Sequence, residues 1–195
     1  MRRFALAVPL LALAACDRGP SVSVENATPE EVAAEMRNSG VAEELRKPGL
    51  WESTMTLSDV SAPGMPPQAL DQMRTMMGNG STTKRCVTAE ELKQVESFVG
   101  QNSANCRFEH YRVSGGKIDG KARCMQGPMT QDMTMNGRFT ANSSDMTIRS
   151  AMSGGPAGQN VTMTMRIASK RLGDCPAGGA EPAAPAAPGA AGAAG

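Results

Sequence analysis

The sequence predicts a mainly β protein: a curved antiparallel β-meander or partial barrel of six to seven strands, with one or two short helices. The first observation is that apolar and polar side chains alternate along several segments, which is typical of strands with one buried face. The second is that glycine, proline and asparagine recur between these segments, where turns require them. The alternating segments are residues 51–58, 104–113, 117–125, 132–139, 146–152 and 161–167.

The composition limits both the size of the protein and the partners that suit it. With 195 residues, the chain has room for one ordinary domain with appendages. It contains 15 Met but only one Trp, one Tyr and four Phe, so its core must consist of aliphatic side chains and methionine. A formal net charge of +1 provides little attraction for a polyanion, and few aromatic rings are present to stack on bases. We therefore expect no nucleic-acid partner.

The first 15 residues have the pattern of a secretory signal peptide. Two arginines precede an apolar run over residues 4–15, which is shorter than the roughly 20 residues that a membrane-spanning helix needs. Leu13-Ala14-Ala15-Cys16 resembles the bacterial lipobox, in which the cysteine becomes the lipidated first residue. We predict a lipoprotein anchored through Cys16 and facing the periplasm, on the inner or the outer membrane. The alternative is an ordinary cleaved signal, which would leave Cys16 as an unpaired thiol.

Residues 16–46 separate the predicted anchor from the first alternating segment. Within them, Thr28-Pro29-Glu30-Glu31 has the pattern of a helix start with a capping box, and the helix is expected to end near residues 38–40. Two arrangements are open: a flexible tether with a reach of about 30 Å, or a short helix packed against the domain. At the other end, residues 176–195 consist of Ala, Gly and Pro with the single charge of Glu181, so we expect a disordered tail.

The domain between these appendages begins with a strand and continues with helical segments. The first strand places Trp51 on its apolar face, where we expect it to anchor the core. Residues 67–77 carry leucine and methionine at helical spacing after two prolines, and this helix is expected to lie on the apolar face of the sheet. Thr88 and Glu91 form a second capping-box pattern, which opens a shorter helix through about Phe98.

Four cysteines besides Cys16 predict two disulfide bonds, because an even number in an exported chain normally pairs. The segments on either side of Ser114-Gly115-Gly116 are expected to form a hairpin. If Val113 faces Lys117 in that hairpin, Cys106 lies directly across from Cys124, within disulfide range. Cys86 is then left to pair with Cys175. The cysteines lack the closely spaced pairs of zinc modules, so we expect no structural zinc.

Short sequence words at both ends of the domain resemble a known family. These words are Lys47-Pro48-Gly49-Leu50-Trp51-Glu52, Cys86-Val87-Thr88 and Arg171-Leu172-Gly173-Asp174-Cys175, with Cys106 and Cys124 between them. With them the chain is similar to an uncharacterised proteobacterial envelope family, domain of unknown function 3617, over about residues 47–175. The resemblance implies export and disulfide bonds, and it implies no reaction, substrate or catalytic residue.

The sequence lacks the motifs of common catalytic sites. His110 is the single histidine, which excludes a histidine metal cluster; its register places it on the same hairpin face as Cys106 and Phe108, where we interpret it as structural. There is no Gly-x-Ser-x-Gly elbow, phosphate-binding loop or His-Glu-x-x-His motif. We therefore expect no catalytic residues, no cofactor and no enzymatic activity.

The methionines support the more specific hypotheses. Met133, Met135, Met163 and Met165 occupy apolar positions of predicted strands, so most simply they are core residues. Thioethers are also ligands for Cu(I), which makes a periplasmic Cu(I)-binding protein the alternative. A third interpretation is a methionine-lined sheet face that accepts an apolar ligand or a segment of an envelope protein, unless the helix at 67–77 fills that space. We expect a non-enzymatic binding or envelope-maintenance module.

Overall fold

The computed structural model describes residues 19–78, 80–93, 105–154 and 160–176. The strands are β1 (Val22–Ala27), β2 (Gly49–Ser61), β3 (Ser81–Val87), β4 (Cys106–Ser114), β5 (Lys117–Gln126), β6 (Met129–Thr140), β7 (Ser143–Ser153) and β8 (Val161–Gly173). The helices are α1 (Pro29–Ser39), α2 (Val41–Leu45), α3 (Pro67–Gly78) and α4 (Ala89–Lys93).

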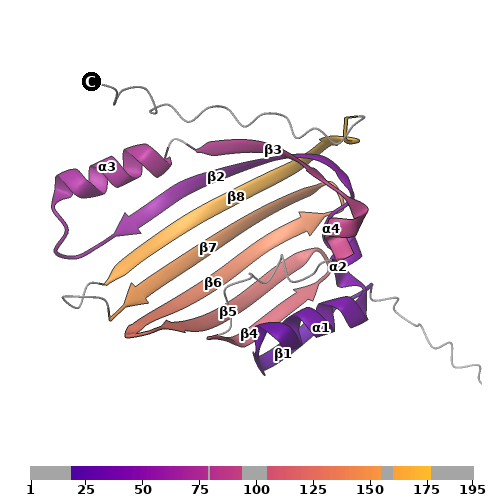
Figure 1. Ribbon diagram of the computed structural model, residues 1–195, viewed down its shortest axis with the longest axis horizontal. Helices are drawn as coiled ribbons and strands as arrows, with labels where there is room; N and C mark the ends of the chain where they lie inside the picture. The colour runs from indigo at the N-terminus through magenta and orange to yellow at the C-terminus, as the bar shows by residue number, and fades with distance from the viewer. Residues whose placement is uncertain (1–18, 79, 94–104, 155–159, 177–195) are drawn as a thin grey trace, which may run out of the picture.

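The eight strands form one antiparallel sheet in the order β1-β4-β5-β6-β7-β8-β2-β3, and the sheet stays open (Figure 1). The predicted fold class is confirmed, with slightly more strands than the six to seven expected. Both additional strands are edges of the sheet: β1 pairs only with β4, and β3 pairs only with β2. The predicted anchor residue Cys16 and the predicted tail beyond residue 176 lie outside the described residues.

Helix α1 begins at the capping box that the sequence predicts. The backbone N–H of Thr28 donates to the Glu31 carboxylate at 2.7 Å, and the N–H of Glu31 donates to the Thr28 hydroxyl at 3.2 Å. The helix ends at Gly40, whose φ of 72° is left-handed and favours glycine. Of the two arrangements that the sequence leaves open, the structure shows the packed helix.

Helices α1 and α2 cover one half of the apolar sheet face. Their buried side chains form a single cluster with apolar residues of β1, β4, β5 and β6. The largest members of this cluster are Met36, Leu45, Phe108, Tyr111, Ile118 and Phe139. The first core of the domain therefore lies under these helices, toward the β1 edge (Figure 1).

Helix α3 forms over Pro67–Gly78, as expected, but the centre of the apolar face is covered by α1 and α2, and α3 lies at β2. Its main contact is with β2, and the guanidinium of Arg74 donates to the carbonyl oxygen of Val60 at 3.3 Å. The reason is the connection: α3 joins β2 to β3, and these two strands are direct neighbours. A helix inside such a hairpin connection stays beside the strand that it leaves (Figure 1).

The β4–β5 hairpin differs by one residue from the predicted register at its turn. Val113 pairs with Ile118 rather than with Lys117. The turn therefore has two residues, Gly115 and Gly116, with φ values of 56° and 72°. Two successive positive φ values define the type I′ turn, which fits the right-handed twist of a hairpin and requires glycine or asparagine.

A β-bulge farther along the hairpin restores the predicted cysteine pairing. The register shifts between Phe108 and His110, so that Cys106 still lies opposite Cys124. The same bulge moves His110 away from the apolar face on which it is expected. His110 lies on the polar face, where its Nε2 atom is 2.8 Å from Oδ1 of Asp119.

Two disulfide bonds join the cysteine pairs that the sequence predicts. Cys106–Cys124 links neighbouring strands over a separation of 18 residues, and Cys86–Cys175 links β3 to the end of the described chain over 89 residues. Among the described helices, none has the length and apolar character required to span a bilayer.

Candidate functional site

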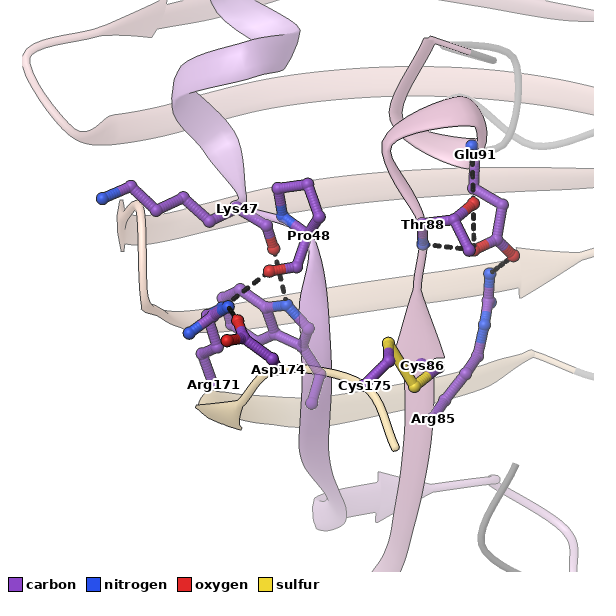
Figure 2. The surroundings of a disulfide bond; sticks show 10 residues. Lys47, Pro48, Arg85, Cys86, Thr88, Glu91, Arg171, Asp174 and Cys175 are labelled. Carbon is purple, nitrogen blue, oxygen red and sulfur yellow. Dashed lines mark hydrogen bonds and ion pairs between the residues drawn. A yellow bond between two sulfur atoms is a disulfide. The ribbon is translucent and has the colours of Figure 1, made fainter. Parts of the chain in front are cut away.

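The opening and closing sequence words meet in space at one end of the sheet. The Nε atom of Arg171 donates to the carbonyl oxygen of Pro48 at 2.7 Å, and its guanidinium also pairs with Asp174 (Figure 2). The Cys86–Cys175 disulfide lies beside them. We call this group the terminal clasp: Lys47, Pro48, Gly49, Trp51, Cys86, Arg171, Gly173, Asp174 and Cys175.

Gly49 is required by the close approach of two backbones within the terminal clasp. Its φ is +141°, and a Cβ atom at this position would lie 2.3 Å from the carbonyl oxygen of Gly173 and 2.5 Å from Nε of Arg171. No side chain fits there without displacing β8 from β2. The glycine of the opening word therefore allows β2 and β8 to pair closely, and the space beside it is filled by Gly173 and Arg171.

Trp51 is the anchor of a second, smaller core. It is 2% exposed and packs in one cluster with Val87 and Leu92. Its indole N–H donates to the carbonyl oxygen of Lys47 at 2.9 Å, so the buried polar atom of the ring is satisfied. The expectation that Trp51 lies in the core is confirmed.

Helix α4 is fixed to the terminal clasp by its N-terminal residues. Thr88 and Glu91 form the predicted capping box, with hydrogen bonds of 2.8 and 3.2 Å (Figure 2). Arg85 on β3 pairs with the same carboxylate at 2.5 Å. The hydrogen bond from Thr88 and then the guanidinium of Arg85 lower the pKa of Glu91. The expected continuation of this helix to Phe98 lies outside the described residues.

A pocket of about 360 Å³ lies between the α1–α2 corner and α4. Its apolar wall comes from several elements and consists of Met36, Ala42, Pro48, Ala89 and Leu92. Its charged lining consists of Arg37, Glu43, Arg46 and Lys47. This volume falls within the range of about 300–1,000 Å³ in which small-molecule sites are found. The pocket is therefore large enough for a small organic molecule.

Arg46 occupies an unusual position in this pocket. Its guanidinium carbon lies 4.5 Å from the centroid of the Trp51 ring, which is a cation–π contact. Burial, and secondarily the positive charge of Arg85, lower the pKa of Arg46. Sequence reasoning missed this residue, because no pattern around Arg46 signals its placement against Trp51. The single available signal is its position directly before the opening word.

The four methionines singled out by the sequence lie on one face of the sheet. Met133 and Met135 are on β6, Met163 and Met165 are on β8, and β7 separates the two pairs. Ser150 lies between Met133 and Met163, and Ile148 lies between Met135 and Met165. All four side chains are partly exposed. Within the described ranges, no three His, Cys, Asp or Glu side chains gather as metal ligands would.

The half of the apolar face over β7, β8 and β2 packs differently from the half under α1 and α2. Met133, Met135 and Met146 contact the helix-covered core, whereas the apolar residues farther along the sheet are outside that cluster. We call this outer group the methionine face: Met55, Ile148, Met152, Val161, Met163, Met165 and Ile167. Its members are partly exposed, and Met55 reaches 43%, whereas their neighbours on the same face of β2, Leu57 and Val60, are buried.

The comparison with protein families agrees with this arrangement of the two sequence words. The family model described as "Protein of unknown function (DUF3617)" matches residues 46–175, a range that includes the whole terminal clasp and begins after α1 and α2. No curated protein matches the chain. No solved structure matches it either. Because the family model covers most of the chain, including all four paired cysteines, the chain belongs to the DUF3617 family.

Proposed function

We propose that this protein is a lipid-anchored, periplasm-facing and non-enzymatic binding module that holds an acyl chain on its methionine face. The observation that carries the proposal is the contrast between the two halves of one sheet face. Under α1 and α2 the apolar side chains are buried, whereas those of the methionine face keep contact with solvent. Apolar side chains that stay accessible on one face of a sheet are a feature of binding sites.

The chemistry of the methionine face suits a flexible apolar chain. Every inward position of β7 from Ser144 to Met152 is apolar or a serine, and so is every inward position of β8 from Val161 to Ser169. The opposite face of the same strands carries charges, among them the Arg166–Asp145 pair. Methionine side chains are unbranched and adapt to ligands of variable shape. An acyl chain, which has no directional polar groups, fits such a surface.

The location in the proposal comes from the sequence. The signal-peptide pattern and the lipobox-like residues before Cys16 support export and acylation. Two disulfide bonds fit an oxidising compartment. Labelling of cells with radioactive palmitate tests the anchor: the mature protein is expected to take up label, and Cys16→Ser is expected to lose it. Label that persists in Cys16→Ser would contradict the anchor.

Photocrosslinking tests the acyl-binding face directly. The acylated protein is reconstituted in phosphatidylcholine vesicles with an uncharged monoacylglycerol that carries a photoreactive group in its chain. Crosslinked peptides, identified by mass spectrometry, are expected to come from β7 and β8. Met165→Gln should reduce crosslinking about tenfold. The bound chain would cover the partly exposed Met165, and full burial of a methionine side chain contributes about 1.5–3 kcal/mol that an amide does not supply.

The neighbouring residue provides the matched control. Thr164 precedes Met165 on the same strand and lies on the opposite face, so Thr164→Gln should leave crosslinking unchanged. Equal loss in both variants, or crosslinks spread evenly over the chain, would contradict the proposal.

Cu(I) binding remains the alternative, and no contact in the described structure favours it. The methionines on β6 and β8 are two strand spacings apart, about 9–10 Å, because β7 lies between them. A titration of the oxidised protein with Cu(I) decides the matter. We expect no binding tighter than micromolar, and submicromolar binding lost in a Met133→Leu/Met163→Leu variant would establish the alternative.

A further inference from the structure

We propose that the pocket between the α1–α2 corner and α4 binds a small anionic amphiphile, an acyl chain with a carboxylate or phosphate head, and that Arg46 receives the head. This site goes beyond the proposed function, because no residue of its lining belongs to the methionine face. Three properties of the pocket support this assignment: Arg46 has no carboxylate partner among the described residues, other cations lie near it, and the pocket has an apolar wall.

Arg46 has no carboxylate partner among the described residues. Its side chain is partly buried, and its guanidinium lies over the Trp51 ring, which offers no oxygen to accept its N–H groups. Glu43 lines the same pocket and makes no ion pair with Arg46. A guanidinium presents five N–H donors in a fork that matches carboxylate and phosphate oxygens. The position therefore provides an unused site for an anion.

The charges near Arg46 increase its preference for an anion. Arg85 is close enough for its positive charge to disfavour the charged form of Arg46, and Glu91 is already engaged by Arg85 at 2.5 Å. Lys47, whose side chain extends away from the terminal clasp, also lines the pocket (Figure 2). An anion placed beside Arg46 would relieve repulsion between these cations, which is the arrangement found where proteins receive carboxylates or phosphates.

The donors of Arg46 face space that a ligand can enter. No buried side-chain nitrogen or oxygen in the described part of the chain lacks a hydrogen-bond partner. The N–H groups of Arg46 are therefore solvent-accessible rather than sealed in the core. The rest of the pocket wall is largely apolar, with Met36, Pro48 and Leu92 as its larger members. A cationic head site joined to an apolar wall matches an amphiphile better than a free inorganic anion.

The test uses Trp51, which is the single tryptophan of the chain and touches Arg46. The acylated protein in phosphatidylcholine vesicles is titrated with octanoate and with octyl phosphate while its tryptophan emission is recorded. A saturable change is expected with both ligands. Octyltrimethylammonium has the same chain with a cationic head and should produce no saturable change. Acetate and inorganic phosphate should bind at least about tenfold more weakly, because they lack the chain.

Variants at Arg46 identify the receiving group. Arg46→Gln should weaken octanoate binding about tenfold or more, since a hydrogen bond to a charged group is lost, and Arg46→Lys should keep most of the affinity. Arg149→Gln, on an exposed arginine of the polar face, is the matched control and should change nothing. Near-ultraviolet circular dichroism verifies that each variant is folded. The comparison of head groups uses the unsubstituted protein, so it tests the proposal even if a variant fails to fold.

The outcomes separate this site from the methionine face. Equal affinity for octanoate and octyltrimethylammonium, or for octanoate and acetate, would overturn the proposal. An unchanged affinity in folded Arg46→Gln would overturn it as well. Met165→Gln should leave the octanoate titration unchanged. The two proposals can therefore fail separately: a negative result at the Arg46 pocket would not contradict acyl binding by the methionine face, and the reverse also holds.

Discussion

The guanidinium of Arg171 donates a hydrogen bond of 2.7 Å to the carbonyl oxygen of Pro48, although 123 residues separate them in the chain. This bond joins the residue before β2 to the C-terminal end of β8. The same arginine pairs with Asp174, one residue before the disulfide-bonded Cys175. One side chain therefore connects both sequence words that the family resemblance rests on.

Replacement of Arg171 is expected to destabilise the fold. The Arg171 side chain is 22% exposed, and Arg171→Gln removes a charged donor from the Pro48 carbonyl, so the free energy of unfolding should fall by about 1.5–3 kcal/mol. Arg166 also forms an ion pair but is 60% exposed, so Arg166→Gln should destabilise the protein clearly less than Arg171→Gln. Urea denaturation measures both, and equal losses would contradict the special role of Arg171.

Gly49→Ala should be more disruptive than alanine at an unconstrained turn. The added Cβ would meet the carbonyl oxygen of Gly173 at 2.3 Å, so β2 and β8 must separate locally. We expect a loss of roughly 2–4 kcal/mol in the free energy of unfolding. Gly127 also has a positive φ, +60°, but its Cβ would meet nothing within 4 Å, and Gly127→Ala should cost about 1–2 kcal/mol. A smaller loss at Gly49 than at Gly127 would refute the close-approach argument.

Trp51→Ala should cost about 3–5 kcal/mol, because it empties the centre of the second core. Trp51→Phe keeps most of the ring but leaves the Lys47 carbonyl without its donor, so a loss of about 1 kcal/mol is expected beyond the change in volume. Chemical denaturation of both variants provides the comparison. A loss below about 1 kcal/mol for Trp51→Ala would show that the residue is not a core anchor.

The two disulfide bonds should differ in their contribution to stability. In the chain-entropy relation, closure of the 89-residue separation contributes about 4–5 kcal/mol and closure of the 18-residue separation about 3 kcal/mol. Removing the long bond with Cys86→Ser/Cys175→Ser should therefore lower the urea midpoint more than Cys106→Ser/Cys124→Ser. The reverse order would mean that the unfolded chain is not the main state on which these bonds act.

The burial of Tyr111 leads us to expect a loss of stability at alkaline pH. Burial raises its pKa to about 12 from 10.0, because the phenolate would lose hydration beside Phe108, whose ring centroid is 5.6 Å away. Above pH 10 the unfolded chain releases the phenolic proton while the folded protein keeps it. The free energy of unfolding should therefore fall between pH 10 and 12, by roughly 3 kcal/mol in total.

The chain contains one tyrosine, so phenolate absorbance in the ultraviolet follows Tyr111 alone. Its appearance should coincide with unfolding, and Tyr111→Phe should remove this part of the alkaline slope. Titration of the folded protein near pH 10 would show that Tyr111 is accessible to solvent.

Alternation of apolar and polar side chains predicted the strands that have neighbours on both sides. In β6, for example, Met133 and Met135 lie on the apolar face and pack against the core under α1 and α2, and Asp132 and Thr134 lie on the opposite face. The two missed strands are the edges. Residues Ser81–Arg85 of β3 are all exposed, so this strand has no buried face there and its sequence shows no alternation of apolar and polar side chains. β1 is short and directly precedes a helix start, which dominates the local pattern.

Register and helix placement were less predictable than element type. The disulfide pairing was predicted correctly, although the assumed turn was one residue too long, because the bulge before His110 offsets the difference. A bulge depends on packing around Phe108 and leaves little trace in sequence. Apolar helical spacing indicates that a helix has a buried face, but it does not identify the surface that covers it. For this reason α3 was assigned the position that α1 and α2 occupy.

The candidate sites show the same division. Local words identified the terminal clasp, since its residues lie in three short segments. The pocket beside Arg46 draws its lining from α1, α2, the entry to β2 and α4, and sequence alone does not bring these together. The contact of Arg46 with Trp51, and the lack of an acidic partner for it among the described residues, are likewise seen only in the three-dimensional structure.

The position of β1 has a consequence for the orientation of the molecule. Val22 is already part of the sheet, and it follows Cys16 by six positions. Six extended residues span at most about 20 Å, so a lipid on Cys16 could lie no farther than that from the start of β1. With the proposed anchor in place, the β1 edge would lie close to the lipid headgroups, and the β3 edge, seven strand spacings or about 34 Å across the sheet, would lie farthest from the membrane.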